Sequence, residues 1–354
     1  MVRRARFCAE MIFMKKKNEN IKKIVFVLIS VLCLVGAFLF SLCAGAEKIN
    51  VFKVLFAKLA EDADFSRVIL LKLRFPRSLL VLLSGALLGG AGAIFQLFFR
   101  NPLAEPGIMG ISSGATLGAV TAQALGLGGG IAGAGMIFIS PLNFFAFGGA
   151  VISGIIVVLL ATGNSRESSN ITLLLCGTAL GTLYSAISSI ILLTSSTEMR
   201  SFYAWTMGSF NGHGWKELCF IIFPAVISIF LMFLISGPLD LLSGGEKSAE
   251  SLGVDVNRLR ILVLVTGALA VSCSVCAGGT ISFVGLIAPH IVRKIFSPKA
   301  KRLIPLSMIF GAIFLLLSDT FARLVIQPGE LPAGIITSIF GVPFFISLIW
   351  NKNR

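Results

Sequence analysis

Charged side chains are scarce in this sequence. Only 13% of its 354 residues are Asp, Glu, Lys or Arg, whereas 56% are hydrophobic. Soluble globular domains carry roughly 25% charged residues, so the composition excludes an ordinary soluble domain. The mean hydropathy of +0.94 instead indicates a membrane protein. We expect an all-α fold, a polytopic membrane helical bundle, because helices satisfy their own backbone hydrogen bonds in lipid.

Histidine is also rare, with two residues, and a nucleotide-binding motif is absent. The predicted topology puts His213 in an outer loop and His290 at the inner end of a span, which excludes a metal site built from both histidines. No catalytic triad or pair of carboxylates converges. The motif G-x-x-x-x-G-K-[ST] is missing, since the string Gly244–Ser248 has the wrong order. We therefore expect no catalytic residue, metal or cofactor in this chain, and any ATP must be hydrolysed by another chain.

Long apolar runs dominate the sequence. A bilayer span needs roughly 20 apolar residues. Small residues recur at four-residue spacing, as in Gly85, Gly89 and Ala93 and again in Gly114 and Gly118, which predicts close helix packing. About ten stretches qualify as spans, at 24–44, 77–99, 107–126, 141–162, 171–194, 218–237, 259–277, 279–296, 304–322 and 333–350.

The basic residues predict the orientation of these spans. An even number of spans puts both termini on one side, and the side richer in Lys and Arg is cytoplasmic. With cytoplasmic termini, the inner segments hold 20 of the 30 Lys and Arg residues, and seven of the outer ten lie in the mixed-charge segment 45–77. The net charge of +14 therefore reflects topology, and we expect no nucleic-acid partner.

The chain reads as one membrane domain at 24–350, with a cytoplasmic tail at 1–23 and a C-terminal tail at 351–354. Residues 1–13 resemble a mis-called translation start, because a Lys-rich string from Met14 precedes the first apolar run. That run, at 24–44, is longer than a signal-peptide core, so we expect it to be a retained span.

Two polar islands interrupt the apolar sequence. The first is Arg100–Gly107 (RNPLAEPG), and the second is GLIAPHIVRK at 285–294. Irregular, non-helical backbone is tolerated at membrane depth only where it is buried in protein, lines a cavity or meets water. The inner loop at 238–260 is polar and helix-prone, which fits either a docking helix for a cytoplasmic partner or a solvated connector.

A transporter that needs no ATPase usually has ionisable residues within the membrane. The clear candidates here are Asp319 and Arg323, with the neutral Gln96. Asp319 and Arg323 are four residues apart, so they can neutralise each other on one helix face. We interpret them as a structural pair, and a secondary transporter or channel stays the alternative hypothesis.

Several strings together carry a family resemblance. They are LRFPRSLLVLLSGALLGGAGAIFQLFFRNPLAEPGIMGISSGATLG (73–118), WTMGSFNG (205–212), GEKSAESLGVDVNRLR (245–260), GGTISFVGLIAPHIVRKI (278–295) and ELPAGIITSIFGVPFFISLI (330–349). In this order the chain resembles the permease subunits of iron-siderophore, haem and vitamin B12 ABC importers, from about residue 24 to 350.

The resemblance implies a fold, partners and a substrate class. Such permeases are ten-span subunits of the bacterial or archaeal plasma membrane that pair with a second copy or a homologous permease around a central path. Two ATP-binding subunits, which hold ATP and Mg²⁺, bind beneath, and an extracytoplasmic binding protein docks on top. The cargo is an iron chelate, with ferric siderophore the first expectation and haem or cobalamin also compatible.

The resemblance also implies roles for two loops at the cytoplasmic side. The inner loop between spans six and seven couples to the ATPase, which identifies Glu246, Ala249 and Gly253 as its contact residues. The cytoplasmic gate residues that the resemblance implies are Asn101, Leu103, Ser169 and Asn170.

Basic residues on the outer side are implied to dock the binding protein. They are Arg74, Arg77 and Arg323, which would meet acidic residues on its two lobes. Rim charges of this kind set orientation and association rate more than affinity. Arg323 has a second predicted partner in Asp319, so it cannot serve both fully.

Overall fold

The computed structural model describes residues 25–45, 61–127, 140–162, 170–194, 203, 205–296, 299–327 and 329–352. Every regular element in these ranges is a helix, which confirms the all-α prediction. The predicted N-terminal tail with its start site, residues 46–60 of the outer loop and Ser169 of the predicted gate lie outside the described residues.

Within the described residues the first helix is Val25–Cys43, and the other helical elements follow it. In chain order they are α3 (Glu61–Val68), the π-helix η1 (Ile69–Arg74), α4 (Phe75–Phe98), the 3-10 helix η2 (Pro106–Met109), α5 (Ile111–Ala124), α6 (Pro141–Thr162), α7 (Asn170–Thr194), α9 (Trp215–Leu234), α10 (Ser236–Leu242), α11 (Glu246–Ser251), α12 (Val256–Gly278), α13 (Val284–Ile295), α14 (Ala300–Val325) and α15 (Ala333–Lys352).

Each of the ten predicted spans contains a helix, but not all of these helices are long. Within the described residues, 7 helices are long and apolar enough to cross a membrane, and α15 is a shorter apolar helix. The helices α5 and α13 have 14 and 12 residues, or roughly 20 Å of length at 1.5 Å per residue, short of the roughly 30 Å hydrocarbon core. Gly110 directly precedes α5 and Phe283 directly precedes α13. Both have positive φ, which interrupts the helical backbone at these positions.

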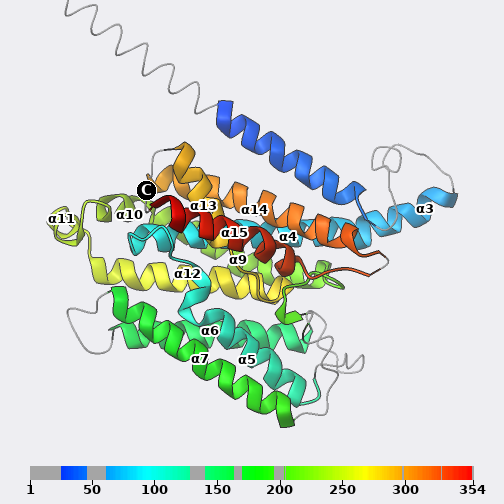
Figure 1. The fold of residues 1–354 in the computed structure, drawn as a ribbon, viewed down its shortest axis with the longest axis horizontal. Helices are drawn as coiled ribbons and strands as arrows, with labels where there is room; N and C mark the ends of the chain where they lie inside the picture. Colours follow the sequence, from blue (N-terminus) through cyan, green and yellow to red (C-terminus); the bar gives the residue numbers. More distant parts are fainter. Residues whose placement is uncertain are drawn as a thin grey trace, which may run out of the picture.

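The helices lie side by side, with α11 at one end of the bundle and α3 at the other (Figure 1). The layer α5 to α7 lies on one side of α12, and α14 with the first helix lies on the opposite side. The most apolar stretches of the α4 and α12 spans are 83% and 78% buried, whereas that of α7 is only 17% buried. The core therefore sits around α4 and α12, and α7 is peripheral.

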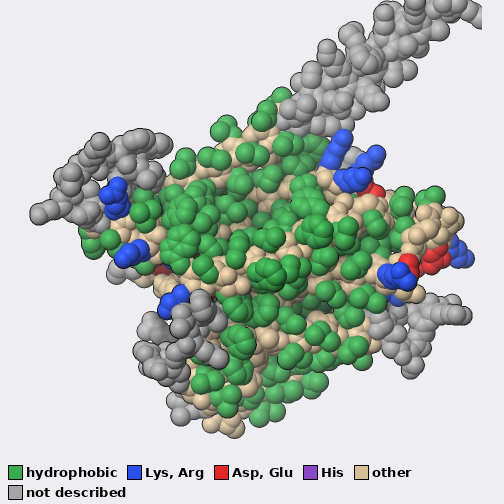
Figure 2. Space-filling model, turned by 180° about the vertical axis from the view of Figure 1, so that it is seen from behind, with side chains coloured by type: hydrophobic (Ala, Val, Ile, Leu, Met, Phe, Trp, Pro, Cys, Tyr) green, Lys and Arg blue, Asp and Glu red, His purple; other side chains and the backbone are tan. Residues whose placement is uncertain are grey.

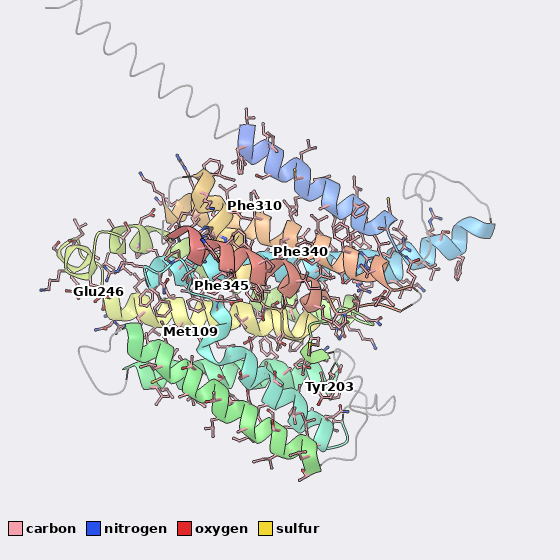
Figure 3. The ribbon with its side chains drawn as sticks, viewed as in Figure 1. Met109, Tyr203, Glu246, Phe310, Phe340 and Phe345 are labelled. Atoms are coloured by element: carbon pink, nitrogen blue, oxygen red, sulfur yellow. The ribbon has the colours of Figure 1, made fainter. Side chains whose placement is uncertain are left out.

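Hydrophobic side chains cover the middle of the surface, and charged side chains gather at its two ends (Figure 2). Glu246 and Tyr203 mark these opposite ends (Figure 3). This distribution is that of a bundle whose middle lies in lipid and whose ends meet water. Tyr203 lies between the predicted spans 171–194 and 218–237, so it stands at the end opposite to the predicted inner loop at 238–260, as one intervening span requires.

Glycines bring the central helices into backbone contact. A Cβ on Gly85 would lie 2.5 Å from the Gly311 carbonyl oxygen, and one on Gly92 would overlap the Gly285 carbonyl. Gly114 is similarly close to Gly149, where a Cβ would lie 2.8 Å from a carbonyl oxygen. The close packing predicted from the small-residue spacing is confirmed, and it leaves no room for side chains at these crossings.

Candidate functional site

The outer end of the bundle holds a buried network of arginines and carboxylates. Arg77, in the first turn of α4, donates from Nη2 to Asp319 Oδ1 at 2.8 Å and from Nη1 to Glu330 Oε2 at 2.7 Å. Asp319 Oδ2 also lies 3.2 Å from Arg323 Nε, one turn further along α14. The predicted Asp319–Arg323 pair is confirmed. Arg77, the additional partner, is 242 residues from Asp319, and no sequence spacing indicates such a contact.

Arginines also cap the first helix. Arg74 donates to the carbonyl oxygens of Leu42 and Cys43 at 3.0 and 3.2 Å. Arg323 donates to the carbonyl oxygens of Ser41 and Ala44 at 3.1 and 3.2 Å. The last carbonyls of a helix have no partner within the helix and carry its partial negative charge, so cations satisfy them well. The arginines thereby fix the outer end of the first helix.

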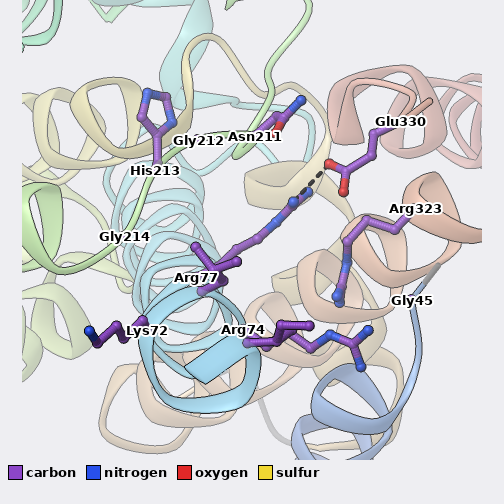
Figure 4. A pocket seen from close by; sticks show the side chains of 12 residues that line it. Gly45, Lys72, Arg74, Arg77, Asn211, Gly212, His213, Gly214, Arg323 and Glu330 are labelled. Atoms are coloured by element: carbon purple, nitrogen blue, oxygen red, sulfur yellow. Dashed lines mark hydrogen bonds and ion pairs between the residues drawn. The ribbon is translucent and has the colours of Figure 1, made fainter. Parts of the chain in front are cut away.

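The three predicted docking arginines line one pocket of about 440 Å³. Figure 4 shows Arg77 reaching across this pocket to Glu330, with Arg74 and Arg323 close by. The side chain of Arg77 is 11% exposed and that of Arg323 is 5% exposed. The structure therefore brings the three arginines together and sets them below the rim of the pocket.

His213 lies on the opposite wall of the same pocket. Trp205 Nε1 donates to Asn143 Oδ1 at 3.3 Å, so the Asn143 amide nitrogen is the group that donates to His213 Nε2, also at 3.3 Å. His213 Nε2 must then carry no proton. Burial in this loop lowers the pKa of His213, which keeps the imidazole neutral.

The short helix α11 forms the inner end of the bundle. Glu246 opens α11 with its side chain 42% exposed, and Gly253 follows the helix in an exposed, left-handed conformation with φ of +85°. Ala249 is fully buried in this chain, so it packs α11 against the bundle. Leu252 directly follows α11 and was not among the predicted contact residues. Its apolar side chain is 64% exposed to solvent.

The predicted gate loop that contains Asn101 and Leu103 is the first polar island, Arg100–Gly107. It folds as a tight turn after α4. Asn101 Oδ1 accepts a hydrogen bond from Leu103 N at 3.0 Å, and Asn101 O accepts one from Ala104 N at 3.1 Å. Asn101 is exposed and Leu103 is half-buried. Asn170, the other described gate residue, is the first residue of α7, so it begins the helix that follows α6.

The gate loop and the coupling helix are neighbours. Arg100 Nη2 lies 3.9 Å from Glu246 Oε1, and both side chains are almost half exposed. Arg100 has φ of +50°, an uncommon conformation for a residue with a Cβ. This contact could not be predicted from the sequence, because 146 residues separate Arg100 from Glu246 and no common motif contains both.

The first polar island is joined to the start of α13, the helix that carries the second island. Glu105 Oε1 accepts the backbone N–H of Phe283 at 2.6 Å. Pro289 has no N–H, so it leaves the Gly285 carbonyl without its helical partner. Gln96 Nε2, from α4, lies 3.4 Å from this carbonyl and 3.3 Å from that of Leu286. The gate loop is therefore anchored to α13 at one end and contacts α11 at the other.

Comparison with known proteins decides the family. The FecCD transport family matches residues 32–351. The chain belongs to this family. The resemblance stated from the sequence is confirmed, and a permease of an ABC importer is favoured over a secondary transporter or channel.

Relatives of this FecCD family permease include transport proteins of known name. This chain is 36% identical over 350 residues to an Fe(3+)-citrate import system permease of Bacillus subtilis, and the alignment covers 96% of this chain and 99% of that protein. It is 37% identical over 290 residues to a cobalamin import system permease of Halobacterium salinarum, covering 82% of this chain and 75% of that protein.

Two solved structures share the fold. One, described as an inward-facing ABC transporter of the metal-chelate type, superposes with a TM-score of 0.80 at 30% identity and covers 92% of this chain and 99% of that one. The other, PsaBC from Streptococcus pneumoniae, has a TM-score of 0.54 at 18% identity over 80% of this chain and 94% of that one, which is a likeness of fold alone.

Proposed function

We propose that this chain is the membrane permease of an ATP-driven importer in a bacterial or archaeal plasma membrane, with both termini in the cytoplasm. ATP and Mg²⁺ are held by two ATP-binding subunits, and an extracytoplasmic binding protein delivers the cargo. Two permeases, identical or homologous, form the path. The activity of this chain is passage of cargo, without a chemical step of its own.

The contact between Arg100 and Glu246 is the observation that carries this proposal. It places the helix assigned to ATPase docking against the loop assigned to the gate, at the end of the bundle that faces the cytoplasm in our topology. An ATPase that grips α11 and shifts it moves the carboxylate of Glu246 relative to Arg100. The same loop is held to α13 by Glu105, so a displacement of α11 acts on a loop with a fixed second end.

The exposed face of α7 supports its role as a wall of the path. Thr178, Thr182, Ser185 and Ser189 are exposed and follow helical spacing, so they form one polar stripe on a peripheral helix. The stripe is more polar than the other exposed positions of α7, such as Leu175 and Leu193. The hydroxyls of Thr178, Thr182 and Ser189 donate to carbonyls of their own helix at 2.8 to 2.9 Å. Their donors are occupied, which suits a wet wall that binds cargo weakly.

A bulky metal chelate is the cargo class that we assign, with an iron chelate first. The named relatives import Fe(3+)-citrate or cobalamin, and both are bulky metal chelates. We propose a ferric siderophore or a similar ferric chelate first, with cobalamin and haem as the other members of the class. The outer pocket, with Arg74, Arg77 and Arg323, is the proposed docking place of the binding protein.

The test is a detergent pull-down of the tagged chain expressed with its native operon, followed by an ATPase assay. Wild-type chain should retain an ATP-binding subunit, and Glu246→Arg should lose it, because the reversed charge faces the partner from the first turn of α11. Lys216→Glu, a reversal of an exposed charge at the outer end, is the matched control and should retain the subunit.

Two results would contradict the proposal. One is a wild-type chain that retains no ATPase, and the other is equal ATPase retention by Glu246→Arg and the control. Uptake of solute by the chain alone in liposomes, without ATP, would favour a secondary transporter and direct attention to Asp319.

A further inference from the structure

The outer pocket has an excess of positive charge. Among the described residues that line it, four are basic, namely Lys72, Arg74, Arg77 and Arg323, and one is acidic, Glu330. Asp319 lies behind the pocket and neutralises part of this charge. The pocket therefore has the electrostatic character of a site for a further carboxylate.

The two acids that Arg77 holds are not equivalent. The side chain of Asp319 is 1% exposed and is bound by both Arg77 and Arg323. The side chain of Glu330 is 26% exposed, lines the pocket and forms an ion pair with Arg77 Nη1. Glu330 is thus the carboxylate that can leave without stranding a buried charge, because water already reaches it.

We propose that Glu330 occupies the place of a partner carboxylate. When the binding protein docks, a Glu or Asp side chain from it replaces Glu330 at Nη1 of Arg77, and Glu330 turns to solvent. The inference rests on the proposed docking function and adds a residue to it. Arg77 keeps two carboxylates before and after the exchange, so the exchange moves no net charge out of the buried network.

The exchange also has a structural consequence. Glu330 stands three residues before α15, in a turn that is otherwise attached to α14 by the hydrogen bond from Leu331 N to Ala322 O at 3.1 Å. The Arg77–Glu330 ion pair links the start of α4 to this turn. Docking therefore breaks the ion pair that links the turn before α15 to α4, while the deeper ion pairs of Asp319 with Arg77 and Arg323 remain.

Two substitutions of Glu330 separate a specific contact from a general field. Glu330→Gln removes the charge. Glu330→Asp keeps the charge but is one methylene shorter, so it cannot span to Arg77 Nη1 without moving the backbone. The measurement is the Kd of the wild-type and variant transporter complexes, in lipid nanodiscs, for the binding protein retained from the same operon. Lys301→Gln, which removes an exposed charge at the inner end of α14, is the control.

If Glu330 competes for Arg77, both Glu330→Gln and Glu330→Asp should bind the binding protein roughly twofold to fivefold more tightly, the range of a partly exposed ion pair. The control should match wild type. Tightening by Glu330→Gln alone would show a field effect and overturn the competition, and unchanged or weaker binding by both variants would overturn it too. A wild-type complex that binds no binding protein would instead overturn the docking function itself, before any variant is compared.

Discussion

The two ends of the bundle hold their charges in opposite ways. At the outer end Arg77, Asp319 and Arg323 are almost fully buried and joined at 2.8 and 3.2 Å. At the inner end Arg100 and Glu246 stand 3.9 Å apart and are 46% and 42% exposed. Breaking a buried pair strands a charge in a poor solvent, whereas an exposed pair contributes little to stability. The outer end is therefore part of the fold, and the inner end is left adjustable for a partner.

Removing the central acid of the outer network should give the largest effect. Asp319→Asn leaves Arg77 and Arg323 without their shared carboxylate, so we expect a loss of about 3 to 5 kcal/mol of stability. Thermal melting in detergent measures it, with the exposed Glu250→Gln as control. A melting temperature equal to that of wild type would show that the network is not structural and would remove the contrast between the two ends.

A smaller effect is expected from the joint between α4 and α13. Gln96→Leu leaves the Gly285 carbonyl without a donor and should cost about 1 to 2 kcal/mol. With Pro289→Ala the restored N–H can bond to Gly285 itself, so Gln96→Leu should cost less in that background. Thermal melts of the two single variants and the double variant give the coupling. Strict additivity would contradict the assignment of Gln96 to the carbonyl that Pro289 frees.

The inner pair should matter for transport more than for stability. Arg100→Gln removes an exposed ion pair and should change the free energy of unfolding by less than about 1 kcal/mol. We expect the ATPase to stay bound while cargo transported per ATP falls several-fold, because the gate loop loses its contact with α11. Proteoliposome uptake measured beside ATP hydrolysis tests this. Equal falls in both activities would point instead to a weakened ATPase interface.

The smallest effect concerns acid. Since burial lowers the pKa of His213, the unfolded chain binds a proton more readily than the folded chain. Stability should be level above the unfolded pKa of about 6.5 and fall as the pH drops below it. His213→Gln, which can still accept from Asn143, should flatten this part of the melting profile between pH 7.5 and 5.5. A variant with the same acid-dependent loss as wild type would exclude His213 as its source.

The sequence allowed prediction of the helices, but not of the contacts between the loops that join them. Hydropathy located ten apolar segments, and the spacing of Gly85 and Gly89 indicated a close crossing that the structure confirms. The helices α5 and α13 are short because Gly110 and Phe283 have positive φ. The hydropathy of an apolar run does not indicate such a conformation.

The partners of the polar residues were beyond sequence reasoning for a physical reason. Asp319 with Arg323 is a local pair and was found from its spacing. Arg77 with Glu330 and Glu105 with Phe283 join positions 253 and 178 residues apart, and only the packing of whole helices brings them together. A single sequence carries no signal for such a pairing.

Uptake of a labelled ferric chelate into proteoliposomes is the most direct test of the central claim. The chain would be reconstituted with its co-purified ATPase and binding protein, with ATP, without ATP, and without the ATPase subunit. We predict accumulation only when ATP, the ATPase and the binding protein are all present. Equal accumulation by the chain alone in the absence of ATP would contradict the account.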